Sequence, residues 1–279
     1  MNLSHRHSFG PFVFLVFVFA LAYAVVLGPS WWWAISYAIH FFIFSFGISF
    51  GLHRLVAHRA GPVPDWIRNF AAIIGVLGQV GSPLGWRTMH VLHHIHADST
   101  EDPHSPKYLG MRVILNLNTP LTKERFVEGL LAGAPLNDPF LMFLHRYYYL
   151  VTAVFLTACF VLFGTNGLVF IGLLPIGLSF FSIGLLNYFT HLDFGYQNFK
   201  VRDHSRNIWW MWPLTYGENW HNNHHQNSRE PCFRVRFFEI DVAHFYFLLA
   251  KHLGKKAMAK TDSELMSPTR LTPPQTRNL

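Results

Sequence analysis

Long runs of apolar residues dominate this chain, rather than an alternation of apolar and polar positions. Four runs, at about residues 11–28, 31–52, 147–163 and 167–190, contain no Asp, Glu, Lys or Arg. Each run is close to the roughly 17–25 residues that a helix needs to cross a bilayer, and one charge at the centre of such a helix costs about 2.5–3.5 kcal/mol. The pattern therefore predicts an all-α integral membrane protein with four transmembrane helices, arranged as two hairpins.

The polar segments between and after the hairpins are predicted to form a helical cap on one side of the membrane. Residues 66–84 are apolar but short and interrupted by Gly, so we expect an element that is interfacial or buried and does not cross. Residues 236–256 mix Phe and Leu with Asp and Lys, which is typical of a helix at the membrane surface and equally compatible with one packed on the protein core. The Ser-, Thr- and Pro-rich tail from about residue 261 is predicted to be disordered. We expect a single membrane domain over residues 1–279.

The distribution of basic residues predicts the orientation in the membrane. Hydrophobic residues make up 51% of the chain and charged residues 13%, with a net charge of +7. Lys and Arg are confined to the start of the chain, to residues 53–146 and to the part after residue 190. By the positive-inside rule, both termini and the large middle segment face the cytoplasm. Because the basic residues flank the spans, they favour anionic lipid headgroups or an acidic protein partner, and no nucleic acid is expected.

Two other features restrict the class of protein. The small residues of Ala20-Leu21-Ala22-Tyr23-Ala24 are compatible with a signal-peptide cleavage site. A second long apolar run follows after only a Gly-Pro-Ser link, however, which favours a helical hairpin. The only cysteines are Cys159 and Cys232, so neither a disulfide nor a Cys-ligated cluster is expected. Any metal must therefore be bound without sulfur.

Histidines in the polar segments indicate such a metal. The pattern His-x-x-His-His occurs twice, at residues 90–94 and 221–225. In a helix, residues at i, i+3 and i+4 share one face, so each copy is expected to present several imidazoles toward one point. Neutral imidazole is a common ligand of first-row metals. These candidate ligands are His90, His93, His94, His221, His224 and His225.

Three further histidines lie at the predicted cytoplasmic ends of spans. His53 and His58 are five residues apart, a rotation of about 140° along an α-helix, so the pair need not bind the same ion. Asn187 and His191 stand at i and i+4 and face the same way. The total of nine histidines exceeds the six ligands of an octahedral ion, so two irons, with a water held by Asn187, are the economical arrangement. A neutral imidazole set suits iron or another imidazole-preferring metal over Mg²⁺ or Ca²⁺.

These motifs carry a resemblance to a known family. The three histidine boxes are HRLVAH (53–58), HVLHH (90–94) and HNNHH (221–225), and they are accompanied by the Asn187–His191 pair, Trp86 and Asp102-Pro103-His104. In these features the chain resembles the membrane-bound fatty acid desaturases, of the acyl-CoA (stearoyl-CoA-type, Δ9-like) branch and in a bacterial form. The resemblance implies a cytosolic cap that holds two irons, O₂-dependent desaturation of an activated acyl chain, and a place in the bacterial inner membrane.

Two departures from that pattern matter. Thr88 and Met89 stand before the second box, where many acyl-CoA members have an Arg-Asp pair. The acyl carrier, whether coenzyme A, acyl carrier protein or a lipid, is therefore left open. No His-Pro-Gly-Gly haem-binding stretch is present in the sequence, so the electrons are expected to come from a separate carrier of the ferredoxin or cytochrome b5 type.

Residues around the boxes are assigned further roles. Trp86 is expected to contact the substrate. Nearby carboxylates and one imidazole are expected to contact and orient the ligand histidines, with a solvated loop as the alternative. These residues are Asp98, Glu101, Asp102 and His104.

Other activities remain open at this point. Hydroxylation or triple-bond formation would use the same metals, and analysis of the products by mass spectrometry separates them from desaturation. A His-rich metal transporter would instead need ionisable groups within the spans to carry ions. Only His40 lies in the middle of a span, where it is expected either to face a substrate tunnel or to form a hydrogen bond between helices.

Overall fold

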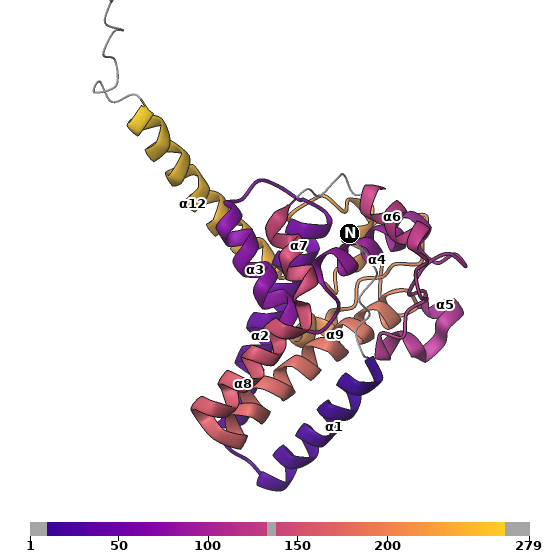
Figure 1. Cartoon of the computed structure of the whole chain (residues 1–279). Helices are drawn as coiled ribbons and strands as arrows, with labels where there is room; N and C mark the ends of the chain where they lie inside the picture. Colours follow the sequence, from indigo (N-terminus) through magenta and orange to yellow (C-terminus); the bar gives the residue numbers. More distant parts are fainter. Residues whose placement is uncertain (1–9, 133–137, 266–279) are drawn as a thin grey trace, which may run out of the picture.

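The computed structural model describes residues 10–132 and 138–265, with residues 255–265 described by their helical backbone alone. Within this part the regular elements are helices, accompanied by two isolated β-bridges, Tyr196 to Asn207 and Asn207 to Trp220. Figure 1 shows the long apolar helices below a cap of shorter ones. The elements are α1 (Gly10–Leu27), α2 (Trp32–Phe42), η1 (Ile43–Ala57), α3 (Asp65–Leu77), α4 (Pro83–His96), α5 (Pro106–Leu109), η2 (Gly110–Leu115), α6 (Lys123–Ala132), α7 (Pro139–Arg146), α8 (Tyr148–Asn166), η3 (Gly167–Leu173), α9 (Leu174–Thr190), η4 (Trp209–Met211), α10 (Trp212–Thr215), α11 (His221–Gln226) and α12 (Val242–Leu265).

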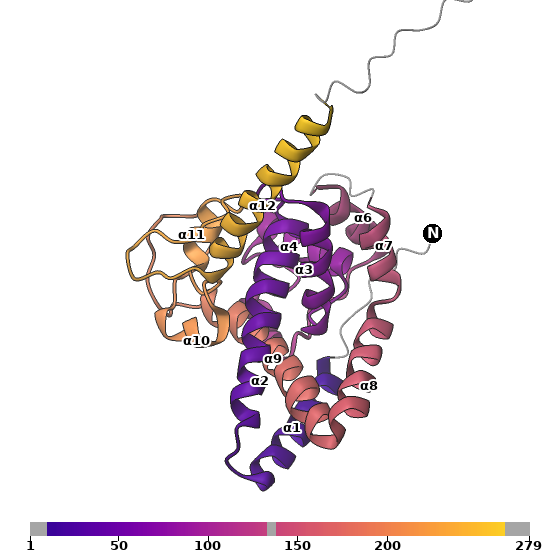
Figure 2. The same cartoon turned by 90° about the vertical axis from the view of Figure 1, so that its left-hand side faces the viewer.

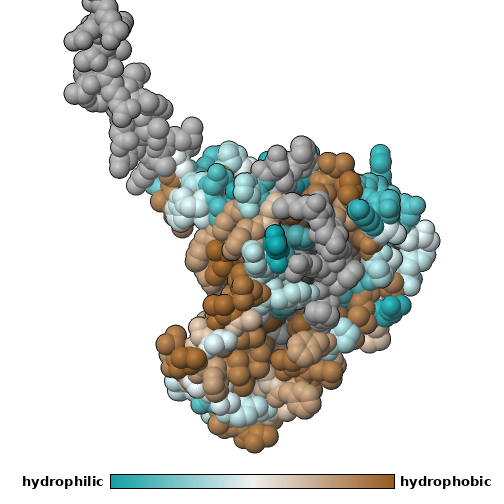
Figure 3. All heavy atoms as spheres, in the orientation of Figure 1, coloured by the Kyte–Doolittle hydropathy of each residue, from teal (hydrophilic) through white to brown (hydrophobic). Residues whose placement is uncertain are grey.

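Three helical stretches in the described chain are long and apolar enough to cross a membrane. They are Gly10–Leu27, Trp32–Ala57 and the 43-residue stretch Tyr148–Thr190. The first matches the predicted span, and the second continues five residues past the predicted end at residue 52. The third contains both remaining predicted spans and is interrupted at Gly164, whose φ of 64° is left-handed, and Figure 2 shows α8 and α9 on either side of that turn. Apolar side chains gather on the lower part of the face drawn in Figure 3.

Two of these stretches are joined by a buried polar contact. His40 of α2 is buried, and its Nδ1 lies 2.9 Å from the Ser179 hydroxyl of α9. A hydrogen bond between helices satisfies polar groups that would otherwise be unpaired in an apolar environment. The contact therefore agrees with the interhelical alternative for His40.

The apolar segment at residues 66–84 is buried against the second stretch. Its helix α3 packs on η1 through small residues, and a Cβ at Gly75 would lie 2.5 Å from the carbonyl oxygen of Gly47. A Cβ at Gly51 would likewise lie 2.8 Å from the backbone of Ala71. Small residues allow helix backbones to approach closely. The predicted segment therefore covers α3 from Trp66 onward and ends at Leu84, the second residue of α4.

The last helix, α12, has one face on the protein and one face exposed. Ala243, Phe247 and Ala250 pack with Phe50 of η1 in a buried cluster, whereas Phe245, Leu248 and Leu249 are exposed. The core alternative for residues 236–256 therefore describes the buried side of α12, and the membrane-surface alternative describes its exposed side. The helix continues to Leu265, past the position 261 at which disorder was predicted, and residues 266–279 of that tail lie outside the described residues.

Buried side-chain amides hold the loops that carry α11. Asn207 Nδ2 donates to Asn223 Oδ1 at 2.9 Å, and Asn223 Nδ2 donates to Glu239 Oε2 at 3.0 Å. Asn219 Nδ2 donates to the carbonyl oxygen of Ile208 at 2.9 Å. Because buried polar groups need partners, this network fixes a segment that has little regular structure of its own. It places α11 beside the end of η1.

Candidate metal centre

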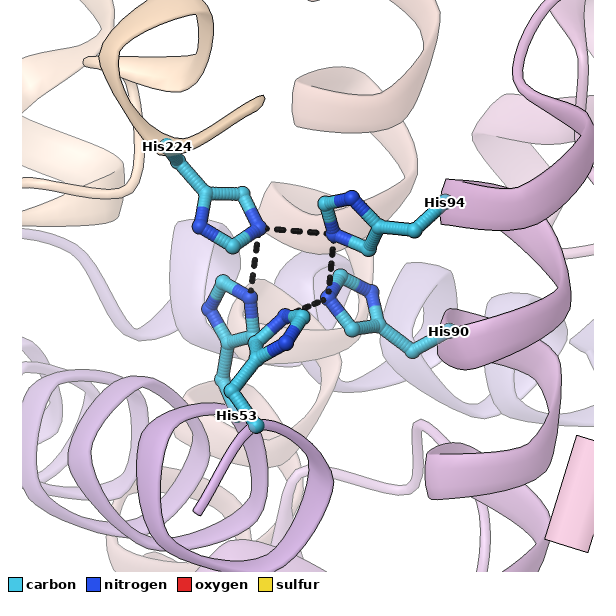
Figure 4. Close-up of side chains that lie close together, drawn as sticks. His53, His90, His94 and His224 are labelled. Carbon is cyan, nitrogen blue, oxygen red and sulfur yellow. Dashed lines mark hydrogen bonds between the residues drawn. The ribbon is translucent and has the colours of Figure 1, made fainter. Parts of the chain in front are cut away.

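The structure brings all nine predicted histidines together in two groups. Within each group the candidate ligand nitrogens lie within 4.8 Å of one another. Figure 4 shows four members of the larger group, His53, His90, His94 and His224, with their ring nitrogens directed toward one another. The group of five consists of His53, His58, His90, His94 and His224, and the group of four consists of His93, His191, His221 and His225.

Each His-x-x-His-His copy is divided between the two groups. From α4, His90 and His94 belong to the group of five and His93 to the group of four, whereas α11 contributes His224 to the first and two histidines to the second. Residues at i and i+4 are about 40° apart on an α-helix, and residues at i+3 point to the other side of i. Two imidazoles of each copy therefore point to one place, and the third points to the other. The two groups are neighbours that share both helices.

His53 and His58 join the same group because the segment that carries them is not an α-helix. Ile43–Ala57 is a π-helix, in which the His58 N–H donates to the His53 carbonyl oxygen at 3.0 Å. Hydrogen bonds from i+5 to i widen the turn and bring residues five apart toward the same face. The rotation of about 140° assumed for this pair holds only for an α-helix and was wrong here.

The donor atoms of both groups fit imidazole-binding metal ions. In the group of five, His58 Nε2 lies 2.6 Å from His90 Nε2, and His224 Nε2 lies 2.8 Å from His94 Nε2. In the group of four, His221 Nε2 lies 3.1 Å from His191 Nε2. The buried Nε2 of His93 has no hydrogen-bond partner in the described part of the chain. Convergent nitrogens, one of them without a partner, are the arrangement that a bound cation would satisfy.

Burial also keeps five of these rings in the form that binds metal. It lowers the pKa of imidazoles in both groups, and the charges of neighbouring histidines lower it further. A metal ligand must be the neutral ring. The lowered pKa therefore keeps the nitrogens available below the ordinary histidine range, for His90, His94, His221, His224 and His225.

Comparison with known proteins agrees with this geometry. The family model for "Fatty acid desaturase" matches residues 29–246. The chain belongs to the fatty acid desaturase family. It is 32% identical to "sn-2 palmitoyl-lipid 9-desaturase" of Nostoc sp. (strain 36), over 86% of this chain and 87% of the relative. It is 30% identical to "sn-1 stearoyl-lipid 9-desaturase" of Anabaena variabilis (75% and 76%) and to "Delta-9 acyl-lipid desaturase 1" of Arabidopsis thaliana (78% and 72%).

In this desaturase, two of the predicted carboxylates contact imidazoles of the group of four. Asp102 lies 3.0 Å from His93 Nδ1, and Asp98 lies 3.2 Å from His191 Nδ1. Burial would raise the pKa of Asp102, but the charge of His93 and their hydrogen bond hold it well below its usual range. A carboxylate that accepts from Nδ1 fixes the tautomer and leaves Nε2 free for a metal. Asp98 and Asp102 thus lie against candidate ligands of the group of four, and their orienting role toward a bound metal stays a prediction.

The other two predicted neighbours, His104 and Glu101, differ in the histidines that they contact. His104 stacks on His93 with ring centroids 4.2 Å apart, and its backbone N–H donates to Asp102. Glu101 instead pairs with His96, at 3.0 Å and in an exposed position. His96 belongs to neither group. Glu101 therefore fits the solvated-loop alternative, whereas His104 packs against a candidate ligand and its role stays a prediction.

Two carboxylates of the desaturase were not singled out from the sequence. Glu218 is fully buried and accepts from His53 Nδ1, and it also pairs with Arg54. Asp203 accepts from His225 Nδ1 at 2.8 Å. The signal for Glu218 was an acid in the GENWHNNHH stretch, three residues before a ligand candidate. Asp203 lies in a loop with no pattern that points to the histidines.

Trp86 and Asn187 both lie beside the histidine groups. The Trp86 ring stacks on His90 with centroids 5.3 Å apart and an interplanar angle of 22°. Asn187 is buried, with 8% exposure, one helical turn before His191 on α9. An aromatic face against a histidine of the group restricts the space next to it. The positions are compatible with substrate contact by Trp86 and with an indirect role for Asn187.

Replacing Asp102 with Asn is expected to weaken metal retention. The neutral amide oxygen of Asn accepts a weaker hydrogen bond from His93 Nδ1 than the charged carboxylate does, and carboxylate partners of this kind contribute about 10–100-fold in metal affinity or activity. We expect the metal content after dialysis against a chelator to fall, while the yield of inserted protein stays the same. The matched control is Glu101→Gln, which removes a carboxylate that contacts no member of the groups. Equal metal loss in both variants would contradict the assignment.

Proposed function

We propose that the two histidine groups bind two iron ions and that the protein is an O₂-dependent acyl desaturase with a di-iron centre. The division of nine imidazoles into a group of five and a group of four carries this proposal, because one ion has at most six positions. His53, His58, His90, His94 and His224 would bind one iron. His93, His191, His221 and His225 would bind the other, with Asn187 acting on it through a water.

The protein side chains would hold and shield the centre. When bound, the irons supply the reduction of O₂ and the removal of hydrogen from two adjacent methylenes. Glu218, Asp98, Asp102 and Asp203 would each hold one imidazole in a fixed tautomer through its Nδ1. Trp86, stacked on His90, would form an apolar wall for the acyl chain. Because a saturated chain has no polar handle, such walls must position the reacting carbons.

We also propose four spans, with both termini and the active site in the cytoplasm. The left-handed turn at Gly164 would divide the 43-residue stretch into two crossings, in agreement with the predicted hairpin. The short links near residues 29–30 and 164–166 have no Lys or Arg, which favours the side opposite the cytoplasm. A bacterial inner membrane suits this topology, and residues 1–279 would form one membrane domain.

For the substrate, we propose a lipid-linked acyl chain with the double bond introduced at or near carbon 9. The relatives named above are lipid 9-desaturases, and Thr88 and Met89 replace the Arg-Asp pair of many acyl-CoA members. Coenzyme A and acyl carrier protein remain the other carriers to be compared. The electrons would come from a separate ferredoxin- or cytochrome b5-type protein.

The decisive experiment is fatty acid profiling after expression in a host that lacks its own desaturase. We expect new monounsaturated chains, with the double bond located by mass spectrometry, and none with the matched variant His93→Ala. Hydroxylated or acetylenic products would replace this proposal by the related di-iron activities. Membranes are supplied with labelled acyl-CoA or with labelled lipid. The labelled compound that is converted to product earlier is the substrate.

The purified protein is expected to contain close to two irons per chain. Nine imidazoles that converge on two places require two ions to satisfy them. Iron determined by mass spectrometry, divided by protein from amino-acid analysis, measures the ratio. A fully active preparation with one iron per chain would contradict the di-iron assignment.

Asn187→Ala is expected to reduce turnover more than folding. If Asn187 holds a water at one iron, its loss disturbs iron coordination by about 10–100-fold in metal affinity or activity. If it only stabilises the end of α9, the loss of a hydrogen bond costs about 0.5–1.5 kcal/mol and leaves catalysis nearly intact. Iron content, thermal midpoint and product yield from one preparation distinguish these outcomes. A lowered midpoint with unchanged yield per folded molecule would favour the purely structural role.

A further inference from the structure

An open pocket lies directly against the group of five histidines. Its volume is about 450 Å³. His94 is partly exposed, and His58, with 9% exposure, is the next most accessible member of that group; both line this pocket. The remaining wall comes from the ends of η1, α4 and α6 and from the loop after α11, with Ala57, Arg59, Val91, Ile95, Ala132, Ser228 and Arg229. The pocket is thus a place where solvent reaches imidazoles of the centre.

The rim of this pocket carries positive charge. Arg59 and Arg229 are both exposed, and neither has an ion-pair partner in the described chain. The segments outside the described residues contain no Asp or Glu, and the carboxylates whose side chains are not described, Asp262 and Glu264, belong to the far end of α12. The basic rim, as we call Arg59 and Arg229, therefore offers two cations to an anionic partner.

Two further observations concern Arg59. Burial and the nearby charge of Arg59 lower the pKa of Arg87 to about 10. Arg59 itself has a left-handed φ of 52°, a conformation that costs energy for a residue with a Cβ and is found mostly where it has a use. The turn directs the chain away from His58 immediately after that histidine. The charges are therefore held at the mouth of the pocket.

We propose that an acidic one-electron carrier protein docks on the basic rim and delivers electrons to the centre over His58 and His94. This proposal rests on the proposed desaturase function. Breaking two C–H bonds of the acyl chain supplies two electrons and two protons. Reduction of one O₂ to two waters needs four of each, so the carrier supplies two electrons, one per docking, and solvent supplies two protons. The carrier leaves oxidised by one electron each time.

A carrier protein fits this surface better than the headgroup of the substrate. A headgroup seated against His58 and His94 would bring the first carbon of the chain to the irons, whereas desaturation takes place at internal methylenes. Electron delivery, in contrast, gains from a short path through the exposed imidazoles. Charges at a rim steer encounter and set orientation, and their contribution falls with ionic strength.

The test uses the full-length protein in nanodiscs and two probes, an acidic [2Fe–2S] ferredoxin and cytochrome b5. Binding of each oxidised carrier to metal-depleted protein is measured by biolayer interferometry at several ionic strengths. For wild type we expect binding of at least one carrier that weakens with salt. For Arg229→Glu, and for Arg59→Glu combined with Arg229→Glu, we expect the Kd to rise at least about tenfold and the salt dependence to flatten. The matched control for the double variant is Lys107→Glu combined with Lys251→Glu, which changes the net charge by the same amount at exposed sites outside the pocket.

With iron-loaded protein, the rate with reduced carrier is compared with the rate with dithionite. In the reversed-charge variants we expect a lower rate with reduced carrier, an unchanged rate with dithionite and an unchanged iron content. Wild-type protein that binds neither carrier at low salt would overturn the proposal. So would variants that keep carrier affinity but raise the KM for the acyl substrate, or that lose affinity only for anionic lipid vesicles. Because the binding assay needs no turnover, its failure is distinguishable from failure of the desaturase function.

Discussion

Replacing His224 with Ala is expected to abolish double-bond formation while leaving the protein in the membrane. His224 Nε2 lies 3.1 Å from His53 Nε2 and 2.8 Å from His94 Nε2, so its ring joins histidines from η1, α4 and α11. Its removal opens the shell of one ion. The expected loss of activity exceeds the roughly 100-fold associated with residues that only orient a ligand. Product formation per inserted molecule and iron content measure the effect.

The control for this prediction is His252→Ala, which removes an exposed imidazole of α12. It changes the histidine count equally and contacts neither group. We expect full activity and two irons in this variant. If His224→Ala retained wild-type turnover, the third box would have to be removed from the centre. A variant that failed to insert would show instead that the ring stabilises the fold.

A methyl group at Gly47 is expected to destabilise the whole protein. A Cβ there would lie 2.6 Å from the backbone nitrogen of Gly75 on α3 and 2.7 Å from the carbonyl carbon of Ile74. Backbone atoms cannot move aside as the end of a side chain can, so η1 and α3 must separate. Overpacking typically costs about 1–3 kcal/mol, occasionally more, and a backbone clash is expected at or above the upper end of that range. Yield of monodisperse protein and thermal midpoint of Gly47→Ala measure the loss.

Gly172→Ala provides the comparison in another membrane segment. The nearest atom to its added Cβ is the terminal methyl of Leu156, at 2.6 Å, which can rotate away. We expect a small change of midpoint there. Equal effects of the two substitutions would mean that glycine is needed in these helices for flexibility rather than for the contact between η1 and α3.

Apolar segments and imidazole ligands could be predicted from the sequence because their physics is local. A run such as residues 11–28 must be removed from water wherever it lies, and the structure gives a helix at Gly10–Leu27. The nine histidines could be assigned to one region because so many imidazoles in polar segments of an apolar chain have little other use. Asp98 and Asp102 lie within a few residues of the second box. Their contacts with ligand imidazoles were therefore within reach of sequence analysis.

What could not be predicted depends on contacts between distant segments. Asp203 lies 22 positions from His225 in sequence, and no periodicity links them. The close approach of Gly47 to Gly75 results from helix packing, which hydropathy does not record. The split of each His-x-x-His-His copy between two groups follows from the position of α11 relative to α4. That position is set by the buried Asn and Glu network of the loops before α12.

The π-helical segment that carries His53 and His58 links the length of this part of the chain to the geometry of the candidate metal centre. Deleting one residue between the two histidines would allow an ordinary α-helix to bring them together, at a spacing of four. If the whole segment became α-helical, each residue further back along the chain would advance by about 100°, more than in the wider π-helical turn, so its orientation relative to His58 would shift progressively. The face of Ile43–Ala57 that meets α3 would turn away from it, including Gly47. In this protein the geometry of the candidate metal centre and the packing of a membrane helix therefore depend on the same residues, and a single-residue deletion cannot change either alone.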